Sequence, residues 1–168
     1  MNKTFYLLFL FVFLVLLQAV LLNNIAFLGH INPYLYIAFV ILFPLKEKRY
    51  LFLFLAFLLG FCVDIFSDSG GIHAFATLFI AYIRLFFIRL FFRKTTSEYV
   101  LFRIHQEPFG KVFNYVTSLV VIHHFLLFSL EHFSFSHIDM VLHNTFFSSI
   151  FTVSLYFMGT FIFRTKTT

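Results

Sequence analysis

The sequence predicts an all-α integral membrane protein that forms a bundle of six transmembrane helices. Two observations support this fold class. Of the 168 residues, 61% are hydrophobic and only 11% are charged, whereas a soluble domain carries about 25% charged residues. The apolar residues also fall into long runs separated by short polar segments, and the mean hydropathy is +0.96. We therefore expect one membrane domain, residues 1–168, in a lipid bilayer.

The apolar runs define the expected helices. A bilayer core of about 30 Å needs roughly 20 apolar residues as helix. The predicted spans are residues 5–22, 34–45, 51–66, 72–92, 112–130 and 141–163. The first run follows Lys3 as in a signal peptide, but it is long for one and no A-x-A-like cleavage site follows, so an uncleaved helix is expected.

The second run is unusually short. As a helix, residues 34–45 extend only about 18 Å. Asn32 and Pro33, which directly precede the run, favour a helix that begins there, and Pro44 favours the end of that helix. Such a helix would tilt little, thin the bilayer locally, or fail to cross.

The basic residues predict the orientation. With six spans, one side of the membrane carries Lys3, Lys46, Lys48, Arg49, Arg93, Lys94, Arg103, Lys111, Arg164 and Lys166. The three segments on the other side, 23–33, 67–71 and 131–140, contain neither Lys nor Arg. Because short cationic loops stay in the cytoplasm, both termini are expected to be cytoplasmic. This arrangement also accounts for the net charge of +5 without nucleic acid as a partner.

The third span carries a charged residue on a face of small residues. Ala56, Gly60 and Asp64 recur every four residues and share one helix face, which favours close approach of another helix. Arg84 lies twelve residues into the fourth span, about 18 Å from its start. We therefore expect no ion pair between Asp64 and Arg84. Arg84 is expected to point its side chain toward the cytoplasmic interface or a cavity.

The turn between the third and fourth spans offers hydrogen-bond donors to Asp64. The candidate donors are Ser67, Ser69 or His73. Asp68 and Gly71 lie in this outer turn, where glycine permits a positive φ. The fourth span then presents its own small face, Ala74, Thr77 and Ala81. We expect the two small faces to pack against each other. Direct contact of Asp64 with a partner or ligand remains an alternative to this structural role.

Polar residues also follow the last two spans. In the fifth they are Asn114, Thr117, Ser118, His123 and His124, and in the sixth Asn144, Thr145, Ser148, Ser149 and Thr152. Two such stripes indicate hydrogen-bonded packing of neighbouring helices. For His123 and His124 we favour a structural role over a protein contact, a metal site or a proton relay. A metal would need further ligands from Cys62, Asp64, Glu131, His132 or His137.

Catalytic motifs are missing from the sequence. It contains no H-E-x-x-H, no G-x-S-x-G and no glycine-rich phosphate loop. Asp64 and Asp68 are one turn apart, but the helix-to-turn junction explains them equally well. We therefore predict that the chain is not an enzyme and has no catalytic residues, metal or cofactor.

Several short patterns resemble one family. They are Gly60-x-x-x-Asp64-Ile-Phe-Ser, Gly71-Ile-His73-Ala74-x-Ala76, Ala81-Tyr82-x-Arg84 and Val121-Ile-His123-His124-Phe-Leu-Leu-Phe-Ser-Leu-Glu131. They resemble the rod shape-determining MreD family, in the form of its Bacteroidetes-type members. Length, span count and the short second helix agree with that family. The hairpin of the third and fourth spans is the most specific part of the resemblance.

The resemblance implies a function and a location. It implies a non-catalytic, multi-pass component of the cell-elongation complex in the bacterial inner membrane, where it helps organise lateral peptidoglycan synthesis and cell shape. The implied partners are MreC-like, RodA-like, PBP2-like and MreB-like proteins. The implied fold is similar to the substrate-binding subunits of energy-coupling-factor transporters. The main alternative is therefore a membrane subunit that binds a small, vitamin-like solute. A channel or proton-coupled transporter would use Asp64, His123, His124 and Glu131.

Overall fold

The computed structural model describes residues 3–25, 31–45, 47–93, 104–132 and 138–162, and its regular elements there are helical. The long helices are α1 (Lys3–Leu16), α3 (Arg49–Ser67), α4 (Ile72–Phe92), α5 (Phe109–His132) and α6 (Ile138–Ile162). A π-helical turn, Leu17–Leu21, and a 3-10 turn, Leu22–Asn24, extend α1. A further 3-10 turn, Ile104–Gln106, precedes α5.

Within these described ranges, five helices are long and apolar enough to cross a membrane, the first of them as Phe5–Asn24. Their limits agree within three residues with five of the six predicted spans. Large apolar side chains such as Phe9, Phe54 and Phe86 are exposed on their outer faces. The all-helical class is confirmed for the described residues, and the long apolar helices indicate a multi-pass membrane protein.

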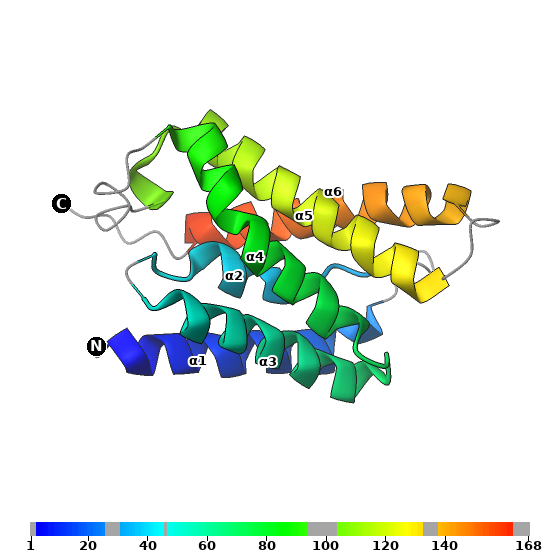
Figure 1. The fold of residues 1–168 in the computed structure, drawn as a ribbon. Helices are drawn as coiled ribbons and strands as arrows, with labels where there is room; N and C mark the ends of the chain where they lie inside the picture. The colour runs from blue at the N-terminus through cyan, green and yellow to red at the C-terminus, as the bar shows by residue number, and fades with distance from the viewer. Residues whose placement is uncertain (1–2, 26–30, 46, 94–103, 133–137, 163–168) are drawn as a thin grey trace.

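The helices run between two ends of the bundle (Figure 1). Asn23 and Asn24, which follow α1, line the same cavity as Ser67 at the end of α3 and Ser69 after it. We call this the turn end, because α3 turns into α4 there. Since α1 and α3 both end at the turn end, the chain between them has to return through the bundle.

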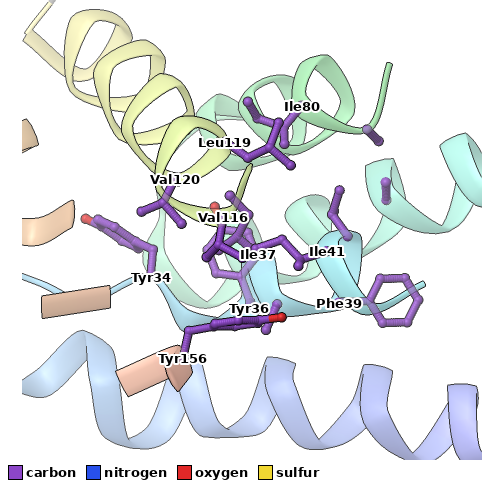
Figure 2. Packing of buried hydrophobic residues seen from close by; sticks show 14 of the residues in the cluster. Tyr34, Tyr36, Ile37, Phe39, Ile41, Ile80, Val116, Leu119, Val120 and Tyr156 are labelled. Carbon is purple, nitrogen blue, oxygen red and sulfur yellow. The ribbon is translucent and has the colours of Figure 1, made fainter. Parts of the chain in front are cut away.

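Residues 31–45, here called the core segment, make this return. They contain a 3-10 turn, Leu35–Ile37, and a short helix, α2 (Ala38–Leu42). Its Tyr36, Phe39 and Val40 are fully buried. Figure 2 shows its apolar side chains against those of α4 and α5, among them Ile80 and Leu119. The core segment is thus the centre of the hydrophobic core.

The predicted sixth spanning helix, residues 34–45, is not confirmed, because α2 has only five residues. Backbone outside the helical turns explains how so short a segment still connects the two ends. A helix rises about 1.5 Å per residue, a 3-10 turn about 2 Å and extended chain about 3.3 Å. With these rises the core segment can reach about 35 Å. It runs from the turn end to the opposite end, where Pro44 and Leu45 line a small cavity with Arg49 of α3.

Helices α3 and α4 form a close pair. A Cβ atom added to Gly60 would lie 2.5 Å from the carbonyl oxygen of His73 and 2.6 Å from the Cα of Ala74. Ala56 and Ala81, on the two predicted small faces, are buried as well. The expectation that these faces pack together is confirmed, and Gly60 permits the backbones to touch.

Candidate functional site

Asp64 of α3 caps the beginning of α4. Its carboxylate accepts hydrogen bonds from the Ser69 hydroxyl at 2.6 Å, the His73 N–H at 2.9 Å and the Ala74 N–H at 2.8 Å. The residue at the N-cap position is Gly71, which has no side chain to offer. Asp64 therefore satisfies, from the neighbouring helix, two of the amides that a helix start leaves without partners. Its charge also faces the positive end of the α4 dipole.

Two of the three donors predicted for Asp64 are confirmed. Ser69 donates through its hydroxyl, whereas His73 donates through its backbone and not through its ring. Ser67 instead accepts a hydrogen bond from the Asn23 side chain at 2.8 Å. That contact ties the end of α1 to the end of α3.

The turn itself needs an unusual backbone. Asp68, Gly70 and Gly71 have φ values of 51°, 66° and 98°. Glycine adopts such values readily, and Asp does so better than most residues. Asp68 is the exposed C-cap of α3, and its N–H donates to the carbonyl of Asp64. The turn thus presents its backbone and the Asp68 carboxylate at the surface.

A cavity of about 730 Å³ opens at the turn end. Asp68, His73 and Glu131 line it, so the fold brings these three predicted residues together. Asn24 and Asn32 contribute amides to its wall, and none of the described residues that line it is Lys or Arg. Such a lining suits a polar or cationic group. Asp64 lies beneath this surface, where its carboxylate is taken up by the cap.

A hydrogen-bonded chain leads from this cavity into the core. The Tyr36 hydroxyl lies 2.8 Å from Nδ1 of His73 and 2.9 Å from Nε2 of His123. Since the hydroxyl has one proton, it donates to one ring and accepts from the other. Nδ1 of His123 is buried without a partner. We assign the N–H of His123 to Nε2, because an unpartnered lone pair is more common in proteins than an unpartnered N–H. The chain therefore ends in the core.

His124 belongs to a second, complete chain. Its Nδ1 lies 2.8 Å from the Val120 carbonyl and can only donate there. Nε2 then accepts from the Thr152 hydroxyl at 3.1 Å, and Thr152 accepts from the Tyr34 N–H at 3.0 Å. These bonds join α5, α6 and the core segment. Within the residues that the structure describes, no three His, Cys, Asp or Glu side chains come together as a metal site.

Arg84 lies on the core side of α4 and is 3% exposed. It donates to the carbonyls of Phe43 at 2.6 Å and Ile41 at 3.2 Å, and to the Tyr115 hydroxyl at 3.1 Å. Its guanidinium also faces the Phe52 ring at 5.1 Å. These two carbonyls lie at the end of α2, where no further helical turn supplies N–H donors, and Arg84 supplies the donors instead. Asp64 binds the N–H of Ala74, which lies ten residues before Arg84 and about 15 Å from it along α4. This separation agrees with the prediction that Asp64 and Arg84 form no ion pair.

The two polar stripes of α5 and α6 meet in one hydrogen bond, between His124 and Thr152. Four other hydroxyls of these stripes are buried without a partner: Thr117, Thr145, Ser148 and Ser149. Among the residues that the structure describes, the expected hydrogen-bonded packing of the two helices is therefore confirmed at this one bond.

Sequence reasoning did not single out Tyr34, Tyr36, Tyr115 or Gln18. Gln18 is fully buried in the π-helical turn and donates to Asn23 and to the Pro33 carbonyl. A signal was present, because hydroxyl and amide groups within apolar runs need partners. The partners of the Tyr36 and Tyr115 hydroxyls lie 31 to 87 positions away, and the sequence does not indicate which residues they are.

Comparison of the chain with protein-family models, curated proteins and solved structures gives no match. The family resemblance therefore depends on the residues quoted from the sequence, and these can be located in the structure. Gly60, Asp64 and His73 join α3 to α4, Arg84 holds the core segment, and His123 completes the chain through Tyr36.

Proposed function

We propose that this protein is a non-catalytic scaffold of the bacterial cell-elongation complex, which helps organise lateral peptidoglycan synthesis and cell shape. It does so by binding MreC-like, RodA-like, PBP2-like and MreB-like proteins in the inner membrane. One observation carries the proposal. The residues that resemble the MreD family fix the α3–α4 hairpin, where Gly60 makes a backbone contact and Asp64 is fully engaged as a cap. In this arrangement Gly60 and Asp64 serve the packing of the hairpin.

The proposal includes six membrane crossings with both termini in the cytoplasm. The core segment supplies the sixth crossing without being a long helix. Arg49 begins α3 and Arg93 follows α4, and Lys111 lies in the first turn of α5. All three lie at the end opposite the turn, as the rule of cationic cytoplasmic loops requires. A reporter inserted within residues 23–33 should be periplasmic, and a cytoplasmic signal there would contradict the six crossings.

Depletion of the protein tests the scaffold role. Cells are expected to lose their rod shape and become round, and wild-type protein should restore the rod. Asp68→Asn serves as a matched control for Asp64→Ala, because Asp68 is exposed and outside the cap. We expect Asp68→Asn to restore the rod and Asp64→Ala to restore it poorly. Unchanged cell shape after depletion would refute the proposal.

A second candidate function is binding of a small, vitamin-like solute. The polar cavity of about 730 Å³ at the turn end favours it, because His73 and Glu131 lie there beside several amides. Native mass spectrometry of the purified protein would then show a bound small molecule. Its mass should disappear when Ala19, which lines the cavity, is replaced by Phe. Repeated absence of a ligand at saturating candidate solutes would remove this candidate.

A further inference from the structure

We infer that the groove between α5 and α6 is a docking site for a transmembrane helix of another polypeptide, one that presents hydrogen-bonding groups at mid-membrane depth. The inference deepens the scaffold role proposed above and rests on it. It assigns binding to a surface that lies apart from the α3–α4 hairpin and from the turn-end cavity.

The groove has a volume of about 600 Å³. Apolar side chains border it, among them Phe113 of α5 and Phe146 of α6, which are 40% and 61% exposed. Thr117, Thr145 and Ser149 also line it. The lining residues on α6 extend from 142 to 154, about 18 Å along the helix axis. This length matches more than three turns of a helix lying in the groove.

Three of the four hydroxyls that line the groove, those of Thr117, Thr145 and Ser149, form no hydrogen bond with the residues that the structure describes. These three oxygens are buried, and Thr145 and Ser149 are only 6% and 4% exposed. Hydroxyls in helices commonly bond to a carbonyl one turn earlier. In this chain Thr77 bonds to the His73 carbonyl and Ser154 to the Ile150 carbonyl in that way. Thr117, Thr145 and Ser149 therefore do not form the bond to a carbonyl of their own helix that Thr77 and Ser154 form.

Their depth points to a polypeptide and not to a lipid. Ser149 lies eleven residues after the start of α6 and thirteen before its end. These separations correspond to about 16 Å and 20 Å along the helix. Lipid ester groups lie near the bilayer surface, and acyl chains offer no hydrogen-bonding group at this depth. Helices that associate in membranes supply such groups through small residues, exposed carbonyls or polar side chains.

A second copy of the chain fits the groove less well. In a two-fold dimer the same patch meets itself, so a concave groove would face another concave groove. The exposed faces of α1 and α3 present large apolar side chains, such as Phe9 and Phe57, which cannot bond to hydroxyls. On α4 the exposed Tyr82 offers one hydroxyl, fewer than the three unpartnered hydroxyls of the groove. We therefore assign the groove to a helix of a different protein.

Photo-crosslinking of the full chain in native membranes tests the inference. Benzoylphenylalanine replaces Phe113 or Phe146 at the groove, and Phe61 or Phe86 as matched exposed controls on α3 and α4. We expect polypeptide adducts from the two groove positions and not from the two controls. The attached peptide should come from an apolar segment of about 20 residues in a protein other than this one.

Removal of the hydroxyls gives the decisive comparison. Thr145→Val with Ser149→Ala keeps the shape of the groove and removes two hydrogen-bonding groups. An interhelical hydrogen bond in a membrane changes an association constant by about threefold, so the adduct yield should fall up to about tenfold at limiting partner. Thr160→Val is the control, because that hydroxyl lies outside the groove and bonds to its own helix, and it should leave the yield unchanged.

Three outcomes would overturn the inference. They are adducts with lipid alone, an adduct of twice the mass of this chain, and a yield that does not respond to loss of the hydroxyls. The test is independent of cell shape. If depletion rounds the cells but no hydroxyl-dependent adduct forms, the scaffold role stands and this docking site is wrong.

Discussion

Replacing Asp64 with Ala tests the structural account most sharply. The substitution removes the acceptor for the N–H groups of His73 and Ala74 and for the Ser69 hydroxyl. A buried donor left without a partner costs about 1–3 kcal/mol, and loss of a charge at a helix start costs about 0.3–1 kcal/mol. We expect the free energy of unfolding to fall by about 3–4 kcal/mol. Asp64→Asn keeps one acceptor oxygen, so a loss of about half that size is expected.

Unfolding in sodium dodecyl sulfate, followed by circular dichroism, is the appropriate assay because the chain has no Trp to report by fluorescence. Asp68→Asn is the control. The side chain is exposed and Asn tolerates the left-handed backbone, so stability should stay within about 0.5 kcal/mol of wild type. A change below about 1 kcal/mol for Asp64→Ala would refute the capping role.

The same assay checks three other contacts. Gly60→Ala should lower the free energy of unfolding by about 1–3 kcal/mol, because the new Cβ meets the backbone of α4. Gly159→Ala is the control, since the space around its Cβ is open, and it should be neutral or stabilising. Equal effects of the two substitutions would contradict the close contact at Gly60. Arg84→Met leaves two carbonyls of the core segment without their donor and should lower the free energy of unfolding by about 3 kcal/mol. Wild-type stability of this variant would contradict a stabilising role for the bonds from Arg84 to these carbonyls. Tyr36→Phe separates two histidines from their shared hydroxyl and should cost about 2 kcal/mol, while exposed Tyr82→Phe should not; the reverse order would contradict the buried chain.

Local features of the fold could be predicted from the sequence. The spacing of Gly60 and Asp64 gave the small face and placed the carboxylate beside the turn, because helical periodicity converts sequence position directly into a face. The position of Arg84 within its helix likewise separated it from Asp64 in depth. Such inferences depend only on residues in one hairpin.

The remaining contacts depend on segments that are far apart in the chain. Tyr36 bonds to residues 37 and 87 positions away, and Arg84 bonds to carbonyls 43 and 41 positions earlier. Hydropathy identified the core segment as apolar, and a helix was expected there because a helix bonds its own backbone carbonyls. The sequence does not show that the Arg84 side chain, 43 and 41 positions later, bonds the carbonyls of Ile41 and Phe43 instead. The polar stripes of α5 and α6 predicted the bond between His124 and Thr152 but no partner for the other hydroxyls, because a stripe shows which groups need partners and not where those partners lie.

Affinity purification of the full chain from native membranes tests the central claim most directly. The protein is solubilised in mild detergent, and co-purifying proteins are identified by mass spectrometry against an unrelated multi-pass protein purified in parallel. The account predicts enrichment of an MreC-like scaffold together with a peptidoglycan glycosyltransferase and transpeptidase. Recovery of the chain with a small solute or with transporter subunits, and without any protein of peptidoglycan synthesis, would contradict it.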